Sequence, residues 1–317
     1  MKSKLIALLM AAVMMAGVLC GCSEANNLVV GTASSTGTFY YVGAAIGNAI
    51  SENSELNVMV QATAGSNENV ALTLSKDIDI GMANSDAIYA AYHGTMSYAE
   101  AGSLDVLQVA ALYNSQLHIF VTQKSGITDI SQLKGKKVCI GSPGTSYLFI
   151  NEAILNAYGI TISDVNPYYM NYAEAAEALS NGDIDAAFQT GGYPIAGIQQ
   201  YAATTSFRML PVAPDVIAQV TEEYPFAIPT TIPAGVYENQ ANESEVDTLA
   251  YQTCLFTSSW VEEEKIYEFT KLMLETLDSY HDTNDATRQI SPESAATQYI
   301  PFHPGAERYY REAGLLD

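Results

Sequence analysis

The chain has 317 residues, of which 48 % are hydrophobic and 15 % are charged, so we expect about two folded domains and exclude general disorder. Acidic residues outnumber basic residues 35 to 13, which gives a formal net charge of −22. A surface of this sign repels nucleic acid, and no stretch rich in lysine and arginine offsets it, so we expect no nucleic-acid partner.

The N-terminal segment has the features of a secretion signal. Lys2 and Lys4 precede LIALLMAAVMMAGVL, an apolar run of signal-peptide length that is short for a membrane span. LCGC follows and resembles a bacterial lipobox. We therefore predict that residues 1–21 are a lipoprotein signal peptide, that Cys22 is lipidated, and that residues 22–28 tether the fold to a membrane. An ordinary signal peptide or a membrane anchor is the alternative.

Two cysteines remain beyond the signal, Cys139 and Cys254, both in apolar segments. A disulfide between them is possible outside the cytoplasm, and two separate buried thiols are the alternative. The sequence has no CxxC pair and no Cys/His spacing typical of zinc. His303 and Glu307, four residues apart in HPGAE, are better explained by a turn that begins a helix. We therefore expect neither a metal nor a cofactor.

Strands and helices alternate along the first half of the chain. LVVGT predicts a buried strand, and apolar residues at Phe39, Val42, Ile46 and Ile50 predict the helix after it. The same order recurs in LNVMVQAT with AGSNENVALTL, and in DIDIGMANSD with AIYAAYHG. LQVAALY and LHIFVTQKSG then predict two further strands.

A second round of the same pattern follows. ISQLKGKKVCIGSPGTSYLFINEAILNAYGI and AEAAEALSNGDIDAAFQTGGYPIAGIQQYA each predict helix, strand, turn and helix. TLAYQTCLFTSS predicts a long strand, VEEEKIYEFTKLMLETLDSYH a helix, and PFHPGAERYYREAGLL a turn with a terminal helix. The pattern indicates an α/β fold with mostly parallel sheets in two lobes, joined by LHIFVTQ and LAYQTCLFT as crossover strands. Ligands of such sheets bind at the carboxyl ends of the strands.

Four turns rich in glycine and hydroxyl groups fall at these strand ends, at residues 34–38, 63–67, 141–146 and 189–193. Glycine lets backbone N–H groups approach a ligand, and a helix N-terminus supplies unpaired donors with a partial positive charge. Such turns can hold a carboxylate without an arginine. Taken singly, each turn is also explained as an ordinary cap, and no phosphate-binding glycine motif matches.

A few single residues could complete such a site. Asp86, at a strand end in ANSDA, is a candidate partner for a ligand ammonium, and a helix N-cap is the alternative. Tyr40, Tyr113 and Tyr193 could form apolar walls with hydrogen-bonding tips, or serve only the fold. None of the four histidines lies in one of the turns and GxSxG is absent, so we expect binding and not catalysis.

The order and spacing of these segments resemble the solute-binding proteins of TRAP transporters, in the TAXI (TRAP-associated extracytoplasmic immunogenic) subgroup. The resemblance runs from about Leu28 to Leu316 and rests on VVGTASSTGTFYYVGAAI, QATAGSNENV, IDIGMANSDAIYAAYHG, LKGKKVCIGSPGTS, GDIDAAFQTGGYPIAGI, TIPAGVY and PFHPGAERYYREAG. It implies a type II periplasmic binding protein fold, whose two lobes close over a ligand by hinge motion. It also implies a permease with a large and a small membrane subunit as partner, and glutamate, glutamine or a dicarboxylate as ligand.

The resemblance carries ligand-binding roles over to Thr36, Gly37, Thr38, Tyr40, Ser66, Asn69, Asp86, Ser142, Thr145, Ser146, Thr190 and Gly191. The turns and tyrosines described above add Ser35, Tyr113, Gly144, Gln189 and Tyr193. Relatives outside the TAXI subgroup hold the ligand carboxylate with an arginine. The arginines of this chain all lie outside the turns, at Arg208, Arg288, Arg308 and Arg311. Carboxylate capture would therefore fall to hydroxyl groups and helix N-termini.

The predicted organisation places lobe 1 at residues 29–118, lobe 2 at 119–252, and a return to lobe 1 with C-terminal helices at 253–317. We expect an extracytoplasmic, lipid-anchored receptor that passes a small carboxylate, such as an amino acid, to a TRAP permease. The acidic field of the protein favours a zwitterion over a dicarboxylate. The alternatives are a ligand-sensing domain without transport, a surface hydrolase or transferase on the same scaffold, and an adhesion protein without a ligand.

Overall fold

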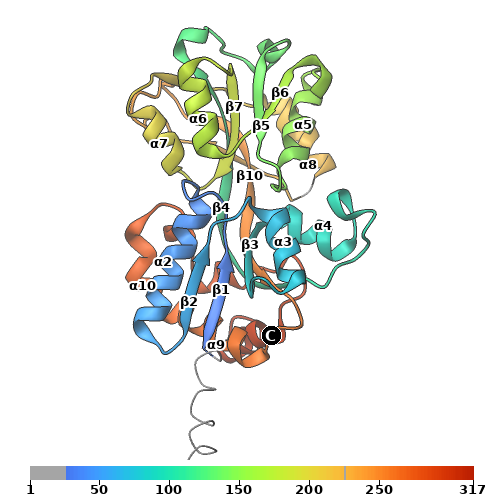
Figure 1. Cartoon of the computed structure of the whole chain (residues 1–317), viewed down its shortest axis with the longest axis vertical. Coiled ribbons are helices and arrows are strands. Elements are labelled where there is room, and N and C mark those ends of the chain that lie inside the picture. The colour runs from blue at the N-terminus through green and yellow to red at the C-terminus, as the bar shows by residue number, and fades with distance from the viewer. Residues whose placement is uncertain (1–25, 225) are drawn as a thin grey trace, which may run out of the picture.

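The computed structural model describes residues 26–224 and 226–317, and the predicted signal peptide and Cys22 lie outside this range. Figure 1 shows two lobes stacked along the long axis, each with a β-sheet between helices. We call the lower one lobe 1 and the upper one lobe 2; the start of the first strand and the C-terminus both lie at the far end of lobe 1. None of the described helices has the combination of length and apolar character that a membrane crossing needs.

Lobe 1 is built on three parallel strands that each lead into a helix. β1 pairs with β2 on one side and with β3 on the other. The residues whose spacing predicted a helix, from Phe39 to Ile50, form the buried face of α2. These elements are β1 (Asn27–Gly31), α2 (Thr38–Asn53), β2 (Asn57–Gln61), α3 (Ser66–Ser75), β3 (Ile80–Asn84) and α4 (Ser85–His93). The predicted tether therefore overlaps the first residues of β1.

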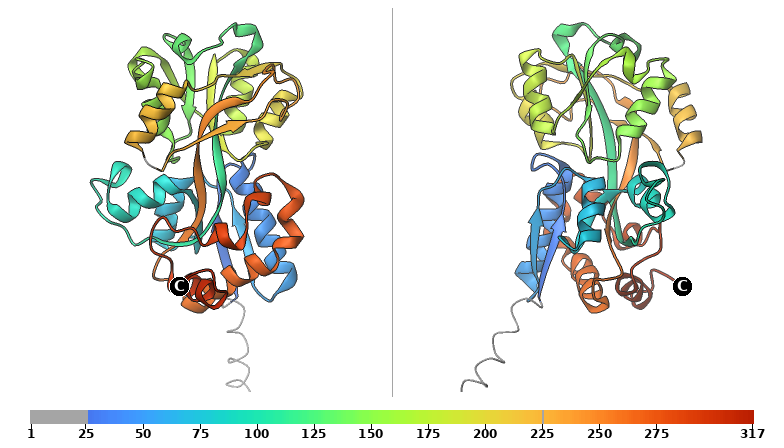
Figure 2. Two further views of the ribbon diagram at one scale, coloured as in Figure 1. Left: turned by 180° about the vertical axis from the view of Figure 1, so that it is seen from behind. Right: turned by 45° about the vertical axis from the view of Figure 1, so that its right-hand side comes forward.

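Two long antiparallel strands, β4 (Leu107–Thr122) and β10 (Val246–Thr257), run through both lobes and join them (Figure 2). The predicted crossover segments lie within them, except for Gln123 at the end of the first. The prediction of two separate strands in LQVAALY and LHIFVTQKSG is wrong, because the polar residues 114–116 between them pair with residues 250–252 of β10. The strand order β2-β1-β3-β10-β4-β7-β5-β6 places the sheets of the two lobes on opposite sides of this central pair.

Lobe 2 repeats the arrangement of lobe 1. β5 lies parallel to β6 and β7, while β8 and β9 pair antiparallel with β4 and β10. The elements are β5 (Lys137–Gly141), α5 (Leu148–Ala157), β6 (Asn166–Tyr169), α6 (Tyr172–Asn181), β7 (Ala186–Gly191), α7 (Ala196–Ala202), β8 (Phe207–Met209), α8 (Pro214–Glu223) and β9 (Ile228–Ile232). β6 escapes prediction because this short strand, NPYY, is mostly exposed and lacks an apolar run.

After β10 the chain returns to lobe 1. The predicted long helix is divided at Thr276, and the rest of the segment is α9 (Glu263–Glu275), α10 (Leu277–Tyr280), α11 (Pro292–Ala295) and α12 (Pro304–Glu312). Single 3-10 turns connect the larger elements at η1 (Met96–Tyr98), η2 (Gln123–Ser125), η3 (Ile130–Leu133), η4 (Ile162–Asp164), η5 (His281–Thr283) and η6 (Thr287–Gln289).

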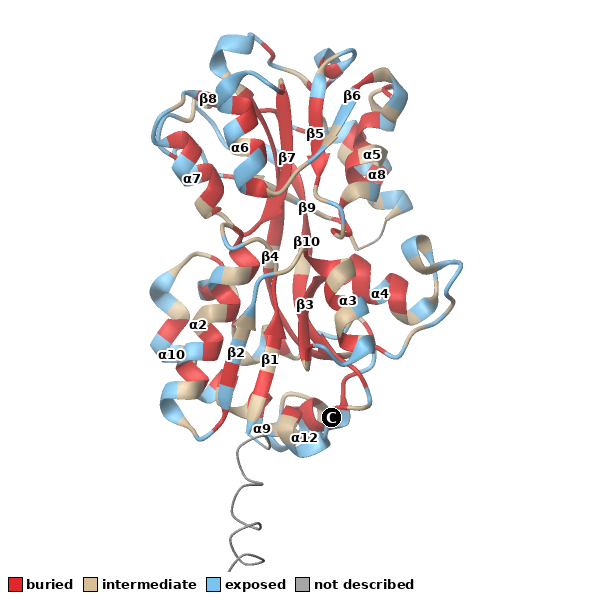
Figure 3. Ribbon diagram, in the orientation of Figure 1, coloured by how far each residue is buried: buried red, intermediate tan, exposed pale blue. Residues whose placement is uncertain are grey.

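The hydrophobic core is divided between the lobes. One cluster, drawn from residues 117–251, fills lobe 2, and two clusters drawn from residues 28–113 and 254–310 fill lobe 1. The central strands β4 and β10 are buried along most of their length (Figure 3). Cys139 lies in the core of lobe 2 and Cys254 in that of lobe 1; both thiols are free, so the disulfide alternative does not hold.

Candidate functional site

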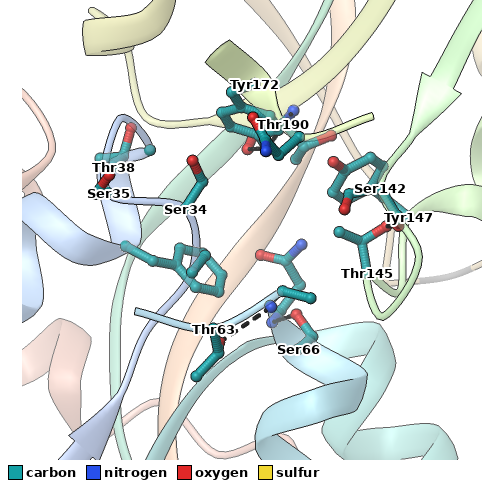
Figure 4. A pocket seen from close by; sticks show the side chains of 17 residues that line it. Ser34, Ser35, Thr38, Thr63, Ser66, Ser142, Thr145, Tyr147, Tyr172 and Thr190 are labelled. Carbon is teal, nitrogen blue, oxygen red and sulfur yellow. Dashed lines mark hydrogen bonds between the residues drawn. The ribbon is translucent and has the colours of Figure 1, made fainter. Parts of the chain in front are cut away.

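A cavity of about 390 Å³ lies between the lobes, at the carboxyl ends of the parallel strands (Figure 4). Its volume is typical of a site for a small molecule. Seventeen residues line it, and none of them carries a charge. Lobe 1 contributes Ala33, Ser34, Ser35, Gly37, Thr38, Phe39, Thr63, Ala64, Gly65, Ser66 and Asn84, and lobe 2 contributes Ser142, Thr145, Tyr147, Asn171, Tyr172 and Thr190.

The loop after β1 brings the N-terminus of α2 to one wall of the cavity. Gly37 precedes this helix without a side-chain cap, and Gly37, Thr38 and Phe39 all line the cavity. The first N–H groups of a helix have no acceptor within it, and the helix dipole makes this end partially positive. Ser34, Ser35 and Thr38 lie together at this end of the cavity in Figure 4. This wall therefore offers several hydrogen-bond donors to an anionic group.

The N-terminus of α3, in the second predicted turn, forms hydrogen bonds with lobe 2. The carbonyl oxygen of Gly144, from lobe 2, accepts the backbone N–H groups of Asn67 at 2.9 Å and Glu68 at 3.3 Å. The Asn67 side-chain amide donates to the carbonyl of Thr145 at 3.0 Å. The start of α3 therefore holds the two lobes together through the N–H groups of Asn67 and Glu68, which are not offered to the cavity.

The wall from lobe 2 is built around Tyr172. Its hydroxyl donates to the carbonyl oxygen of Thr190 and accepts the N–H of Thr190 at 3.0 Å, which fixes the ring. Burial raises the pKa of Tyr172 and that of Tyr147 above the usual range, so both rings present neutral hydroxyl groups. Ser142 and Thr145 face the α2 wall across the cavity (Figure 4).

Three polar atoms at this cavity lack a partner among the described residues. They are Oγ1 of Thr190 and the hydroxyl of Tyr147, in lobe 2, and Oδ1 of Asn84, in lobe 1, and all three are buried. A buried polar atom without a hydrogen bond costs free energy, about 1–3 kcal/mol by mutational measures. A polar ligand in the cavity could bond to these atoms.

Seven of the predicted ligand-binding residues line the cavity: Ser35, Gly37, Thr38, Ser66, Ser142, Thr145 and Thr190. The other ten do not line it: Thr36, Tyr40, Asn69, Asp86, Tyr113, Gly144, Ser146, Gln189, Gly191 and Tyr193. Several of these shape its walls. The Asn69 side-chain amide donates to the carbonyls of Gly31, Thr32 and Met82, which ties the end of β1 to that of β3.

Sequence reasoning missed part of the lining. Ser34, Thr63 and Gly65 belong to the predicted turns but are not among the predicted ligand-binding residues. Asn171 and Tyr172 follow β6, so the missed strand concealed the loop that places them. An expectation of polar residues after every parallel strand, including weak edge strands, would have found them.

Asp86 lies at the start of α4, behind the cavity wall. Its side chain is buried and accepts a 3.0 Å hydrogen bond from the hydroxyl of Ser146, in lobe 2. Burial raises the pKa of Asp86 to about 6, and the hydrogen bond from Ser146 opposes this rise. Asp86 is not among the residues that line the cavity, so a ligand ammonium held there would not make the direct contact with its carboxylate that the sequence predicted.

Two of the four histidines, His303 and His118, make buried hydrogen bonds that support the fold. Nδ1 of His303 accepts the N–H of Gly305 at the start of α12, as expected for a helix cap. His118 is buried in β4 beside the hydroxyl of Tyr237, and burial lowers its pKa to about 4. Within residues 26–224 and 226–317, no group of three or more His, Cys, Asp or Glu side chains is placed to hold a metal ion.

Comparison with known proteins connects this architecture to a family. The model of the NMT1-like family matches residues 30–314. Among solved structures, a protein from Bordetella bronchiseptica RB50 is 13 % identical, with 93 % of this chain and 90 % of that chain covered and a TM-score of 0.54. PhnD1 from Prochlorococcus marinus (MIT 9301), in complex with methylphosphonate, is 12 % identical, with coverages of 92 % and 99 % and a TM-score of 0.50. These similarities confirm the predicted two-lobe fold of the solute-binding proteins.

Proposed function

The chain belongs to the NMT1-like family, and from this premise we propose that it is an extracytoplasmic solute-binding receptor. Its ligand is a small carboxylate of the amino-acid class, such as glutamine or glutamate. The main support is the uncharged cavity between the lobes, which combines the open N-terminus of α2 with hydroxyl groups from both walls. Charge-free walls suit a ligand whose own charges balance.

In this proposal the two ends of a zwitterion meet different walls. The carboxylate lies at the first turn of α2, near Ser35 and Thr38, where backbone donors converge. The ammonium lies among neutral oxygen acceptors, of which Oδ1 of Asn84 is unpartnered. Asp86 is not required as a direct partner.

The delivery partner and the anchor belong to the same proposal. The resemblance to TAXI proteins supports a TRAP permease with a large and a small subunit as the recipient of the ligand. A lipid on Cys22 would attach the protein at the end of lobe 1 where β1 begins, away from the cavity (Figure 1). Uptake by proteoliposomes that contain the permease, with and without this protein, tests the first part, and mass spectrometry of the N-terminal peptide tests the second.

Calorimetric titration tests the ligand class. L-glutamine, L-glutamate, succinate and glucose are titrated into the wild type and into Thr190→Val, with Thr221→Val on α8 as the control. Thr190 Oγ1 has no partner within residues 26–224 and 226–317, so its loss should weaken amino-acid binding without weakening the fold. Binding of glucose alone, or equal affinity in all three proteins, would contradict the proposal. Identification of the co-purifying small molecule by mass spectrometry gives an independent answer.

A further inference from the structure

The carboxylate of Asp86 lies in the contact between the two lobes. Asp86 is 1 % exposed and Ser146 is 3 % exposed, and their 3.0 Å hydrogen bond joins α4 of lobe 1 to the loop after β5 of lobe 2. These residues are 60 positions apart in the sequence and belong to different lobes. The bond therefore forms only when the lobes are closed.

Further contacts between the two lobes surround Asp86 and keep its side chain buried. The same loop of lobe 2 sets the Gly144 carbonyl on the N-terminus of α3, and the Thr145 carbonyl accepts the Asn67 side-chain amide. Opening the lobes would separate these groups and admit water to Asp86. The carboxyl group thus exchanges a buried environment for a solvated one each time the lobes open.

No Lys, Arg or His side chain among the described residues forms an ion pair with this carboxylate. The titratable groups that face it are Tyr98 from η1, and Tyr251 and Cys254 from β10. Burial, and after it proximity to Asp86, raises the pKa of all three. All three groups are neutral near pH 7, and none of the ion pairs formed by the described residues includes Asp86. Its Oδ2 atom has no hydrogen-bond partner among them. A buried charge in such a setting is costly, and taking up a proton removes the cost.

We infer that closure of the lobes is coupled to uptake of one proton by Asp86, so that the Asp86–Ser146 contact acts as a proton-dependent latch beside the ligand cavity. The direction follows from burial, which raises the pKa of Asp86 to about 6 in the closed form, against 3.8 for an ordinary aspartate. A group whose pKa is higher in one state favours that state as the pH falls. Closure therefore becomes about tenfold more favourable between pH 8 and pH 5.

This latch is distinct from a direct contact between Asp86 and a ligand ammonium, because the two predict opposite pH dependence. An ammonium partner would require the ionised carboxylate, so acid would weaken binding. A latch requires the protonated carboxyl group in the closed form, so acid strengthens binding. The sign of the pH effect therefore decides between them.

The experiment has one arm with a ligand and one without. The arm with a ligand rests on the proposed function and uses calorimetry with L-glutamine, whose own groups do not titrate between pH 5 and pH 8. In the wild type, affinity should rise about tenfold from pH 8 to pH 5, with uptake of up to one proton shown by the dependence of the heat on buffer. Asp86→Asn, which mimics the protonated form, should bind with the same high affinity at both pH values. Asp105→Asn is the control, since Asp105 accepts serine hydroxyl groups within lobe 1 alone. Burial acts to raise the pKa of Asp105, but hydrogen bonds from Ser259 and Ser258 outweigh it, so that this pKa is lowered.

The second arm measures the radius of gyration of the ligand-free proteins by small-angle X-ray scattering. At pH 8, Asp86→Asn should be more compact than the wild type, and at pH 5 the two should converge. Identical scattering of the two proteins at both pH values would overturn the latch, as would glutamine affinity that falls with acid. Failure of glutamine to bind at any pH would refute the amino-acid ligand and leave the scattering arm to decide the latch.

Discussion

The two edges of the cleft close through contacts of different chemistry. At the α2 edge, the Thr38 hydroxyl donates to the Gly192 carbonyl at 2.6 Å, and the N–H of Gly197 donates to the Thr36 carbonyl at 3.0 Å. At the α3–α4 edge, the Gly144 carbonyl caps α3 and Ser146 bonds to the Asp86 carboxylate. The two contacts at the first edge join neutral groups, whereas the Ser146 contact at the second edge involves a carboxyl group that ionises.

This difference separates two contributions to the free energy of lobe closure. Neutral hydrogen bonds contribute equally at every pH in the working range, so the α2 edge sets a constant part of the closure energy. A buried carboxyl group makes the other contribution depend on protons. The two edges can therefore be tested separately, because a variant at one should change the affinity and a variant at the other should change its pH dependence.

The largest effect is expected where a side chain would block the α3–α4 edge. Gly144 has a φ angle of +88°, and a Cβ atom there would lie 2.9 Å from the Cβ of Ala64 in the opposite lobe. Gly144→Ala should therefore weaken L-glutamine binding tenfold or more, as overpacking costs about 1–3 kcal/mol. Gly144 does not line the cavity, so the loss reports closure.

Gly182→Ala is the matched control for this variant. Gly182 has a φ angle of +80°, but a Cβ atom there would meet nothing within 4 Å. Both variants carry similar backbone strain, and only Gly144→Ala creates the contact between lobes. Equal calorimetric affinities in the two variants would show that the Gly144 contact plays no part in closure.

The next largest effect concerns the stability of the fold. Acid should lower the free energy of unfolding, whereas it should favour closure of the lobes. His118 is neutral in the fold because burial lowers its pKa to about 4, while the unfolded chain has a histidine pKa of 6.5. Protons therefore bind the unfolded state first as the pH falls below 6.5. The free energy of unfolding should fall by about 2 kcal/mol from pH 7 to pH 5 on account of this group.

Urea unfolding of the wild type and of His118→Gln measures this contribution. The variant should lose about 2 kcal/mol less than the wild type over the same pH interval. An identical pH dependence in the two proteins would remove His118 as its source. If His118 contributes as expected, acid weakens the fold while it strengthens the latch. Ligand affinities of variants at the two edges are therefore best compared above pH 5.

The sequence allowed most of the elements that form the cavity to be predicted, β6 being the exception, because their signals are local. The apolar face of α2 and the glycine turn before it are encoded within some twenty residues. Thr38, which lines the cavity, could therefore be predicted from this stretch alone. Thr190 was found for the same reason, at the end of β7.

What could not be predicted depends on contacts between distant segments. The continuity of β4 through the polar residues 114–116 is set by pairing with β10, more than 130 positions later. The position of Asp86 behind the wall depends on a loop of lobe 2, and the ring of Tyr172 is oriented by the backbone of Thr190. The spacing of residues along the chain does not encode which loop lies opposite which.

A smaller effect is expected at the α2 edge. Thr38→Val keeps the shape of the side chain but removes the donor to the Gly192 carbonyl. L-glutamine affinity should fall by about fivefold, since a hydrogen bond of this kind contributes about 1 kcal/mol. The decrease should be the same at pH 5 and pH 8. Thr270→Val, which removes a hydroxyl that bonds within α9, is the control and should bind normally.

The smallest effect on affinity, and the most specific, is expected from Ser146→Ala. The Ser146 hydroxyl donates to the Asp86 carboxylate and so opposes the rise in its pKa. Without this donor the pKa of Asp86 in the closed form should rise further, while the pKa in the open form stays the same. Affinity for L-glutamine at pH 8 should then fall by only a few-fold, but the midpoint of the pH dependence should move upward. Calorimetry at steps of half a pH unit resolves this change.

Thr38→Val is the comparison and should leave that midpoint in place. A midpoint that moves equally in both variants would mean that the two edges act as one contact, and the distinction between a neutral edge and a titrating edge would then be lost.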